Sequence, residues 1–516
     1  MTIYKIVIII FLLIYVSNKS SVQNIFVDLN GNDDNTGTIE HPLKTIPAAV
    51  NKIEAGDTIF VREGDYNLSG TINISKSGNS KSMYYLFAYK SERVLLDFSS
   101  SINGTKGIYL TGSYWHIKGF SITGAGGNGM RISGASNNII ELCIFYENRE
   151  TGLQLSNGAS DNKIINCDSY YNADSYPDSD GSVYDDADGF APKLTVGSGN
   201  YFYGCRSWGN CDDGWDGYMR GASEVTTFLE NCWTFENGYL KDRSDPGPHA
   251  NGNVFKMGGG DNSNNQHLMH HFVLKNCLAF NNKARGFDQN NNDGSMTLFN
   301  CTGFGNKSAN YKITRQVNEG QTVTTENCIS LFGNVDLGDF VIQKTNSWMT
   351  QFNVSHADFI STDTVGVRGP RKPDGSLPDI NFMHLSKGSD LIDAGTNVGI
   401  PYQDLAPDLG AFEYGISTPA GVDDIKSLPE DIYLYQNYPN PFNPSTTIKY
   451  EIPHSSRVKI ILFDLLGREV KELVNEVKNA GIYKVKFNAT SLVSGVYFYK
   501  LEAGDLIQVK RMMFLK

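Results

Sequence analysis

The chain has 516 residues, enough for two or more domains, and its 40% apolar content is ordinary for a globular protein. The net charge of −12 is uneven, because residues 431–516 carry 12 Lys+Arg against 8 Asp+Glu and the rest is strongly acidic. The strongly acidic charge of residues 1–430 argues against nucleic acid binding. It would also repel an acidic polysaccharide unless metal ions bridge the two. The 52 glycines favour tight turns and hence a β architecture.

The N-terminal residues predict a secretory signal peptide over residues 1–22. Lys5 is followed by an apolar run from Ile6 to Val16, which is shorter than the about 20 residues that a membrane-spanning helix needs. We therefore expect an exported chain whose mature form has no membrane span. Residues 39–57, "IEHPLKTIPAAVNKIEAGD", predict a short amphipathic helix that covers the open end of the domain that follows.

A repeat of about 23 residues dominates the next part of the chain, and cysteines mark it. An Asn follows five residues after each of the first six, and a marker, usually a Gly before a large apolar residue, follows at 9 or 22 residues. Val254 and Asn310 take the place of the Gly in two coils. The longer distance indicates two insertions at the same corner of the repeat, residues 173–188 and 238–253. Short β-branched segments with this period predict a right-handed parallel β-helix. The repeated cysteines are Cys143, Cys167, Cys205, Cys232, Cys277, Cys301 and Cys328.

The cysteines of such a repeat stack in a buried apolar ladder, so we expect few or no disulfides. Cys211 does not fit the repeat and is the one most open to pairing. In the strand that follows the Gly marker, side chains alternate between the core and the surface. The outward column then contains Arg131, Gln154, Ala191, Asp216, Lys256, Asp288 and Lys312.

Four carboxylates converge in this register, those of Asp188, Asp212, Asp213 and Asp216. Neighbouring coils lie about 4.8 Å apart, so Asp188 and Asp213 become stacked like charges. A single Asp beside a Gly often only caps a turn. Four such residues in adjacent coils instead favour a binding site for a hard cation. Ca²⁺ suits such a site, because it takes 6–8 oxygen ligands in irregular geometry. Zinc or copper would want His or thiolate ligands, and the spacing is not that of an EF-hand.

Lys256 stands one coil beyond these carboxylates, in "GNVFKMGGG". It is either a surface ion pair or a general base. The two insertions leave the same corner and would wall a groove over this surface. Calcium and an amine together suit β-elimination on a uronic acid polymer, in which the C5 proton lies next to a carboxylate.

Three segments resemble the family 9 polysaccharide lyases, which are pectate and exopolygalacturonate lyases on a parallel β-helix: "DADGFAPKLTVGSGNYFYGCRSWGNCDDGWDGY", "NGNVFKMGGG" and "RGFDQNNNDGSMTLFNCTGFGN". The resemblance spans about residues 24–415. It implies calcium ligands at Asp188, Asp212, Asp213 and Asp216, and Lys256 as the Brønsted base. The chain departs from the family at Val254, where a small residue is more usual.

Further residues near this surface are candidates for substrate binding, each with the alternative of an ordinary surface or turn residue. Arginine fits a carboxylate with two parallel hydrogen bonds, which makes it the most specific of them. Asp288 and Asn290 have a second alternative, in which they orient Lys256. The candidates are Arg285, Lys193, His249, Asn251, Asp288 and Asn290.

After the β-helix we expect a linker over residues 416–430 and an antiparallel β-sandwich over 431–516, because strand-like runs alternate there with turn signals. "YPNPFNP", "DLLGREV" and "SGVYFYKL" look like the C-terminal sorting domain of the type IX secretion system. That resemblance implies passage through this machinery to the medium or the cell surface. The alternative is a carbohydrate-binding or adhesive module.

The sequence therefore predicts a secreted, monomeric, calcium-dependent pectate lyase with a catalytic domain over residues 23–415. Three alternatives remain: a lyase for another uronate polymer, a polygalacturonase-like hydrolase on the same fold, and a non-catalytic β-helix adhesin stabilised by calcium. Endo against exo cleavage, methyl-ester tolerance and the number of calcium ions stay open.

Overall fold

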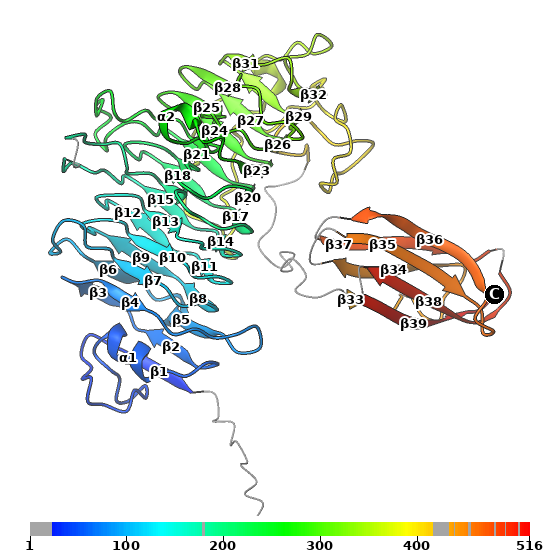
Figure 1. The fold of residues 1–516 in the computed structure, drawn as a ribbon, viewed down its shortest axis with the longest axis horizontal. Coiled ribbons are helices and arrows are strands. Elements are labelled where there is room, and N and C mark those ends of the chain that lie inside the picture. Colours follow the sequence, from blue (N-terminus) through cyan, green and yellow to red (C-terminus); the bar gives the residue numbers. More distant parts are fainter. Residues whose placement is uncertain are drawn as a thin grey trace, which may run out of the picture. The chain divides into compact units, whose positions relative to one another are not determined.

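The structure, a computed structural model, describes residues 23–177, 181–415, 433–437, 439–452, 456–478, 481–490, 492–503 and 506–516. The predicted signal peptide and linker lie outside these residues. The chain divides into two units near residue 420, which are described separately (Figure 1). None of the described helices has the length and apolar character to cross a membrane.

The first unit is a parallel β-helix in which each coil passes through three parallel sheets, named A, B and C (Figure 1). Sheet A consists of β1 (Asn24–Val27), β2 (Thr58–Val61), β5 (Tyr84–Ala88), β8 (Trp115–Lys118), β11 (Ile139–Glu141), β14 (Lys163–Ile165), β17 (Asn200–Tyr203), β20 (Val225–Glu230), β23 (His270–Lys275), β26 (Met296–Phe299), β29 (Val323–Glu326) and β32 (Ile342–Lys344).

Sheets B and C continue each coil with strands of two to five residues. Sheet B consists of β3 (Gly64–Asn67), β6 (Val94–Asp97), β9 (Phe120–Thr123), β12 (Ile144–Tyr146), β15 (Asp168–Tyr170), β18 (Arg206–Trp208), β21 (Trp233–Phe235), β24 (Leu278–Phe280), β27 (Thr302–Phe304) and β30 (Ile329–Leu331). Sheet C consists of β4 (Ile72–Ile74), β7 (Ile108–Leu110), β10 (Met130–Ser133), β13 (Leu153–Ser156), β16 (Phe190–Pro192), β19 (Trp215–Asp216), β22 (Phe255–Lys256), β25 (Arg285–Asp288), β28 (Ala309–Ile313) and β31 (Val335–Leu337).

The predicted helix is α1 (Ile46–Lys52), which starts at the N-cap Thr45 and packs on β1, β2 and β4 at the first coil. A second short helical turn, α2 (Asp261–Asn264), follows β22, and 3₁₀ turns occupy Tyr89–Ser91 and His356–Asp358. The predicted β-helix with its N-terminal helix is confirmed.

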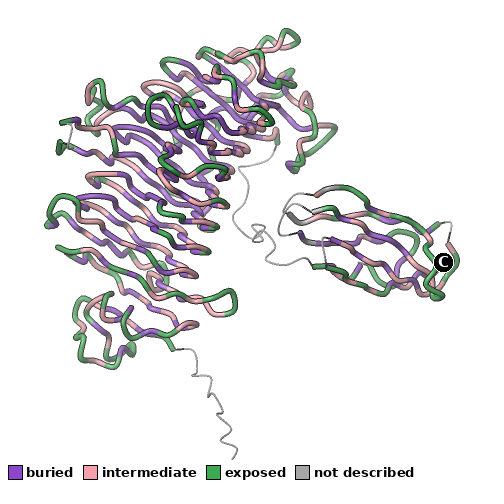
Figure 2. Tube along the Cα trace, viewed as in Figure 1, coloured by how far each residue is buried: buried purple, intermediate pink, exposed green. Residues whose placement is uncertain are grey.

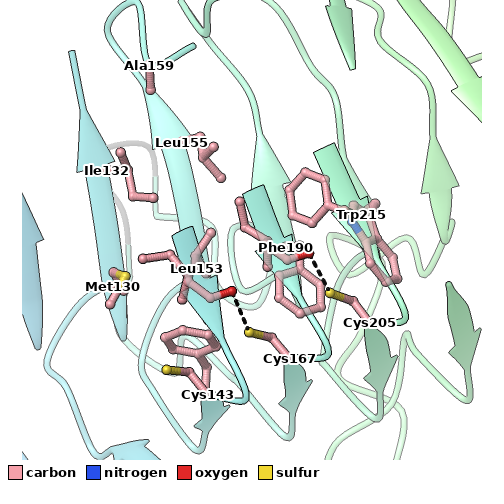
Figure 3. Close-up of a cluster of buried hydrophobic side chains, with 14 of the residues drawn as sticks. Met130, Ile132, Cys143, Leu153, Leu155, Ala159, Cys167, Phe190, Cys205 and Trp215 are labelled. Carbon is pink, nitrogen blue, oxygen red and sulfur yellow. Dashed lines mark hydrogen bonds between the residues drawn. The ribbon is translucent and has the colours of Figure 1, made fainter. Parts of the chain in front are cut away.

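The interior of the coils is a continuous apolar core. Buried residues, polar ones included, are purple in Figure 2 and follow one another along the coils. The inward side chains of sheet C pair in the predicted order, from Met130 and Leu153 through Phe190 and Trp215 (Figure 3) to Phe255, Phe287 and Tyr311. Where a Gly precedes one of these residues, packing can require it: a Cβ at Gly189 or Gly214 would lie 2.1 Å from the hydroxyl of Ser207 or Thr234.

The repeated Cys and Asn residues form two separate columns. All eight cysteines are buried and unpaired, Cys211 included, so the repeat cysteines act as small apolar residues. The asparagines form a buried ladder in which each side-chain amide donates to the carbonyl oxygen of the next, as between Asn172 and Asn210 (2.8 Å) and between Asn282 and Asn306 (2.7 Å). Backbone turns are thereby fixed at the same corner of successive coils.

The coils end at Lys344, and the rest of the first unit packs back along the outside of sheet B. Phe359, Phe382 and Phe412 contact a cluster that includes Trp233 and Phe280. The repeat does not extend into this segment, and its packing on sheet B was not predicted.

The second unit contains two antiparallel sheets that share one core, the predicted sandwich. One consists of β33 (Tyr433–Leu434), β34 (Ser445–Ile452) and β37 (Gly481–Asn488). The other consists of β35 (Ser456–Phe463), β36 (Glu469–Lys478), β38 (Gly495–Ala503) and β39 (Leu506–Phe514).

Candidate active site on sheet C

The outward column of sheet C has the predicted register. Asp216 pairs with Lys256, Lys256 with Asp288 and Asp288 with Lys312. The two insertions join β15 to β16 and β21 to β22, so both leave the coil between sheet B and sheet C, as expected. The second reaches the carboxylates directly, because the backbone N–H of Asn251 donates to Asp212 (2.8 Å).

Three carboxylates come together at this position. Oxygens of Asp188, Asp213 and Asp216 lie within 4.8 Å of one another, and all three side chains are buried. Asp212 is also buried, beside Asp213, but it lies outside this trio. Asp188 is further held by the hydroxyl of Thr151 (3.0 Å) and by the backbone N–H of Asp213 (3.3 Å).

Two lysines neutralise part of this charge. Lys256 Nζ lies 2.9 Å from Asp213 and 3.3 Å from Asp216. Lys193 Nζ lies 2.8 Å from Asp188 and 3.1 Å from Asp216, with its side chain only 7% exposed. Four carboxylates therefore face two ammonium groups, and the cluster has too little positive charge of its own.

The pKa values of the carboxylates reflect this imbalance. Burial raises the pKa of Asp188 to about 6, and it raises the pKa of Asp212 and Asp213 well above the usual range. Burial acts the same way on Asp216, but Lys256 and Lys193 outweigh it and hold that pKa at about 2. Protons or a metal ion would relieve the remaining repulsion.

The donor set fits a hard divalent cation. Every ligand atom in the trio is a carboxylate oxygen, the type that Ca²⁺ prefers. Oδ1 of Asp213 is buried and, in the described part of the chain, has no hydrogen-bond partner. Since an unpaired buried oxygen is costly, this atom marks the place where a cation would bind.

Lys256 lies where a base is needed. Without a metal, however, its amine keeps its proton and cannot act as a base. Burial lowers its pKa, but Asp213, Asp216, Asp212 and Asp188 outweigh burial and hold the value well above the ordinary one. Additional positive charge among the carboxylates would move the pKa downward. The ring of Tyr218, which the sequence analysis did not single out, lies 5.8 Å from Nζ.

The other candidates occupy three different settings. Arg285 donates to both oxygens of the buried Asp288 (3.1 Å each). Asn290 donates to the carbonyl of Gly258 (2.9 Å), two residues after Lys256 in sequence. His249 is exposed on the second insertion. The amine of Lys193 is engaged by the carboxylates, so its predicted contact with substrate stays a prediction, as do those of the other candidates.

Comparison with known proteins agrees with this geometry. The family described as "Pel9A-like, right handed beta helix region" matches residues 25–330, and the "Secretion system C-terminal sorting domain" matches residues 436–515. Pectate lyase L of Dickeya dadantii (strain 3937) is 38% identical over 410 residues, which cover 77% of this chain and 92% of that protein.

Two solved structures share the β-helix. The crystal structure of pectate lyase Pel9A superposes with a TM-score of 0.69 at 36% identity, covering 77% of this chain and 97% of that one. A rhamnogalacturonan lyase superposes with a TM-score of 0.62 at 27% identity, covering 71% and 97%. The fold and these relatives define a polysaccharide lyase. The chain belongs to the Pel9A-like right-handed β-helix family, and its C-terminal sorting domain directs it out of the cell.

Proposed function

We propose that the chain is a calcium-dependent pectate lyase that cleaves α-1,4-linked polygalacturonate by β-elimination. The observation that carries the proposal is the placement of an amine, Lys256 Nζ, 2.9 Å from one member of a buried trio of carboxylates on the exposed side of sheet C. Membership of a lyase family and the similarity to pectate lyase L support it over hydrolysis and over a purely adhesive role.

In the proposed reaction Lys256, as the neutral amine, takes the proton from C5 of a galacturonate unit. The electron pair of the C5–H bond forms the C4–C5 double bond, the C4–O4 bond breaks, and O4 leaves and gains a proton. The products are a new chain end and a 4,5-unsaturated sugar. The lysine then returns its proton to solvent.

Asp188, Asp212, Asp213 and Asp216 are the proposed calcium ligands. Calcium bound there would draw negative charge from the uronate carboxylate, which makes C5–H more acidic, and would lower the pKa of the nearby amine. The chain's own part is to hold the oxygens rigidly: Asp188 through Thr151 and Lys193, and Asp216 through the backbone N–H of Tyr218 (3.0 Å).

The domain boundaries are also proposals. We assign residues 1–22 to a signal peptide, 23–415 to the catalytic β-helix, 416–430 to a linker and 431–516 to the sorting domain. The likeness to a rhamnogalacturonan lyase keeps another uronate-containing polymer as the second candidate substrate.

The test is the ultraviolet absorbance of the double bond during incubation with polygalacturonate and calcium, with and without chelator. Lys256→Ala should lose activity by several orders of magnitude. Lys256→Arg keeps the positive charge but cannot release its proton near neutral pH, so it should be equally inactive while folding normally. Lys275→Met, at the end of β23 on sheet A, is the matched control. Near-full turnover by either Lys256 variant would reject the lysine as base.

A further inference from the structure

A cavity of about 460 Å³ lies further along sheet C, on the coils that follow Lys256. It involves β25, β28 and β31, and the outward column enters it two positions beyond Lys256 at Lys312, which pairs with Asp336. Its walls carry two cationic side chains and few apolar ones. The lining residues are Arg285, Ser308, Ala309, Lys312, Asn334, Val335 and Asp336.

Arg285 is held in a way that leaves half of its guanidinium group available. Nη1 donates to both oxygens of Asp288, which is 1% exposed and therefore a fixed anchor. In the described part of the chain, Nε and Nη2 have no hydrogen-bond partner, and the side chain is 37% exposed. This edge is the one that binds a carboxylate with two parallel hydrogen bonds.

Lys312 supplies a second cation on the same cavity. Its Nζ forms an ion pair with Asp336, and both side chains are substantially exposed, at 33% and 50%. Exposed pairs of this kind contribute about 0–1 kcal/mol, so an incoming carboxylate can compete for the amine.

The spacing connects the cavity to the proposed reaction centre. Neighbouring strands lie about 4.8 Å apart, which places Lys312 about 10 Å along the sheet from Lys256. A polymer lying along sheet C with one sugar at Lys256 would carry its neighbouring sugars past Arg285 and Lys312. In polygalacturonate every one of these sugars has a carboxylate.

We propose that this cavity is a subsite in which Arg285 and Lys312 bind the carboxylate of a second uronate unit of the same substrate chain. The inference rests on the proposed function and adds a specificity to it. It assigns to Arg285 and Lys312 the choice, at this one position of the substrate, of a uronate over a methyl ester or a neutral sugar.

The test compares Arg285→Gln and Lys312→Gln with Lys307→Gln, which removes the same charge from an exposed neighbour that does not line the cavity. On de-esterified polygalacturonate at fixed calcium, each cavity variant should raise KM by about tenfold, with a smaller change in kcat. Arg285→Lys should recover part of the loss. The preference for de-esterified over methylated substrate should shrink in Arg285→Gln and stay unchanged in Lys307→Gln.

Binding is measured separately from catalysis. Calorimetry with a galacturonate oligomer on Lys256→Ala and on Lys256→Ala/Arg285→Gln should show weaker binding by the double variant. Equal KM values and equal oligomer affinities would overturn the subsite. Absence of unsaturated product from the wild-type enzyme on any uronate polymer would instead overturn the proposed function, and the oligomer affinities would still report on the cavity.

Discussion

Carboxylates are buried on sheet B and on sheet C of the same coils, and their pKa values are shifted in opposite directions at Asp168 and at Asp212 and Asp213. On sheet B, Asp168 accepts hydrogen bonds from Arg206 (2.9 and 2.7 Å) and from Arg371 (2.6 Å). Burial would raise the pKa of Asp168, but the two arginines outweigh it and hold the value below the usual range. On sheet C, the pKa values of Asp212 and Asp213 are raised well above that range.

The difference separates a structural use of buried charge from the one that we propose to be functional. Asp168 has all its countercharge within the chain, and Arg371 comes from the segment that packs on sheet B, so the ion pairs fasten that segment to the coils. The sheet C cluster has two ammonium groups for four carboxylates and leaves an oxygen of Asp213 unpaired. Its missing charge is the feature that a bound cation would supply.

The largest effect on stability is expected from Arg206→Met. The change leaves the buried Asp168 with one arginine, and removing one partner of a buried pair destabilises a protein by about 3 kcal/mol or more. Denaturant unfolding measures it. Arg93→Met, which breaks an exposed pair with Asp65, should cost less than about 1 kcal/mol.

A second variant distinguishes lost charge pairing from lost packing. Asp168→Asn in the Arg206→Met background removes the uncompensated charge and should restore part of the stability. Calcium affinity should stay that of the wild type in both. An unchanged unfolding midpoint in Arg206→Met would show that the ion pairs do not fasten the segment.

The fold was predictable where the sequence repeats, because the distance from Cys to the marker, nine residues or 22 where an insertion intervenes, fixes which residues stack. That spacing placed Asp216, Lys256 and Asp288 in one column, which the register confirms. The packing on sheet B was not predictable in this way. Asp168 and Arg371 are 203 residues apart, and the segment that carries Arg371 has no period.

The directions of side chains outside the strands could not be predicted from the sequence either. Lys193 directly follows β16, where alternation no longer applies, and the structure places its amine against Asp188 and Asp216. The cavity at Lys312 had a signal in the same outward column, but only the structure shows that the coils leave a hollow there.

The next effect in size is expected at the carboxylate trio. Asp213→Asn should weaken calcium binding by more than about tenfold, since changes to residues that merely support a metal ligand already cost that much. It should also raise the melting temperature of the metal-free protein, because it removes a buried like charge. Calorimetric titration and thermal melting with and without chelator measure both.

Asp65→Asn is the control, since Asp65 is an exposed carboxylate on β3 of sheet B, several coils before the carboxylate trio. It should leave the calcium affinity and the calcium-dependent rise in melting temperature unchanged. Wild-type calcium affinity in Asp213→Asn would remove this residue from the proposed ligand set.

The smallest effect is a difference in pH dependence between the two buried settings. The folded pKa of Asp168 lies below its unfolded value of about 3.9, so its contribution to stability is present above that pH and is lost as pH falls through the folded pKa. The folded pKa of Asp188 is raised to about 6, so the metal-free native state takes up a proton that the unfolded chain does not, and stability rises as pH falls from about 7 towards about 4.

Thermal melting of the metal-free protein should therefore give a maximum in mildly acidic solution and a decline below about pH 4. Saturating calcium should remove the rise, because a cation on the carboxylates takes the place of the proton, and should leave the acidic decline to which Asp168 contributes. The melting temperature of the metal-free protein could instead climb steadily from pH 5 to pH 7. That result would mean that the negative charge of the sheet C carboxylates is already neutralised within the chain. In that case the comparison with Asp168 would no longer single them out as a cation site.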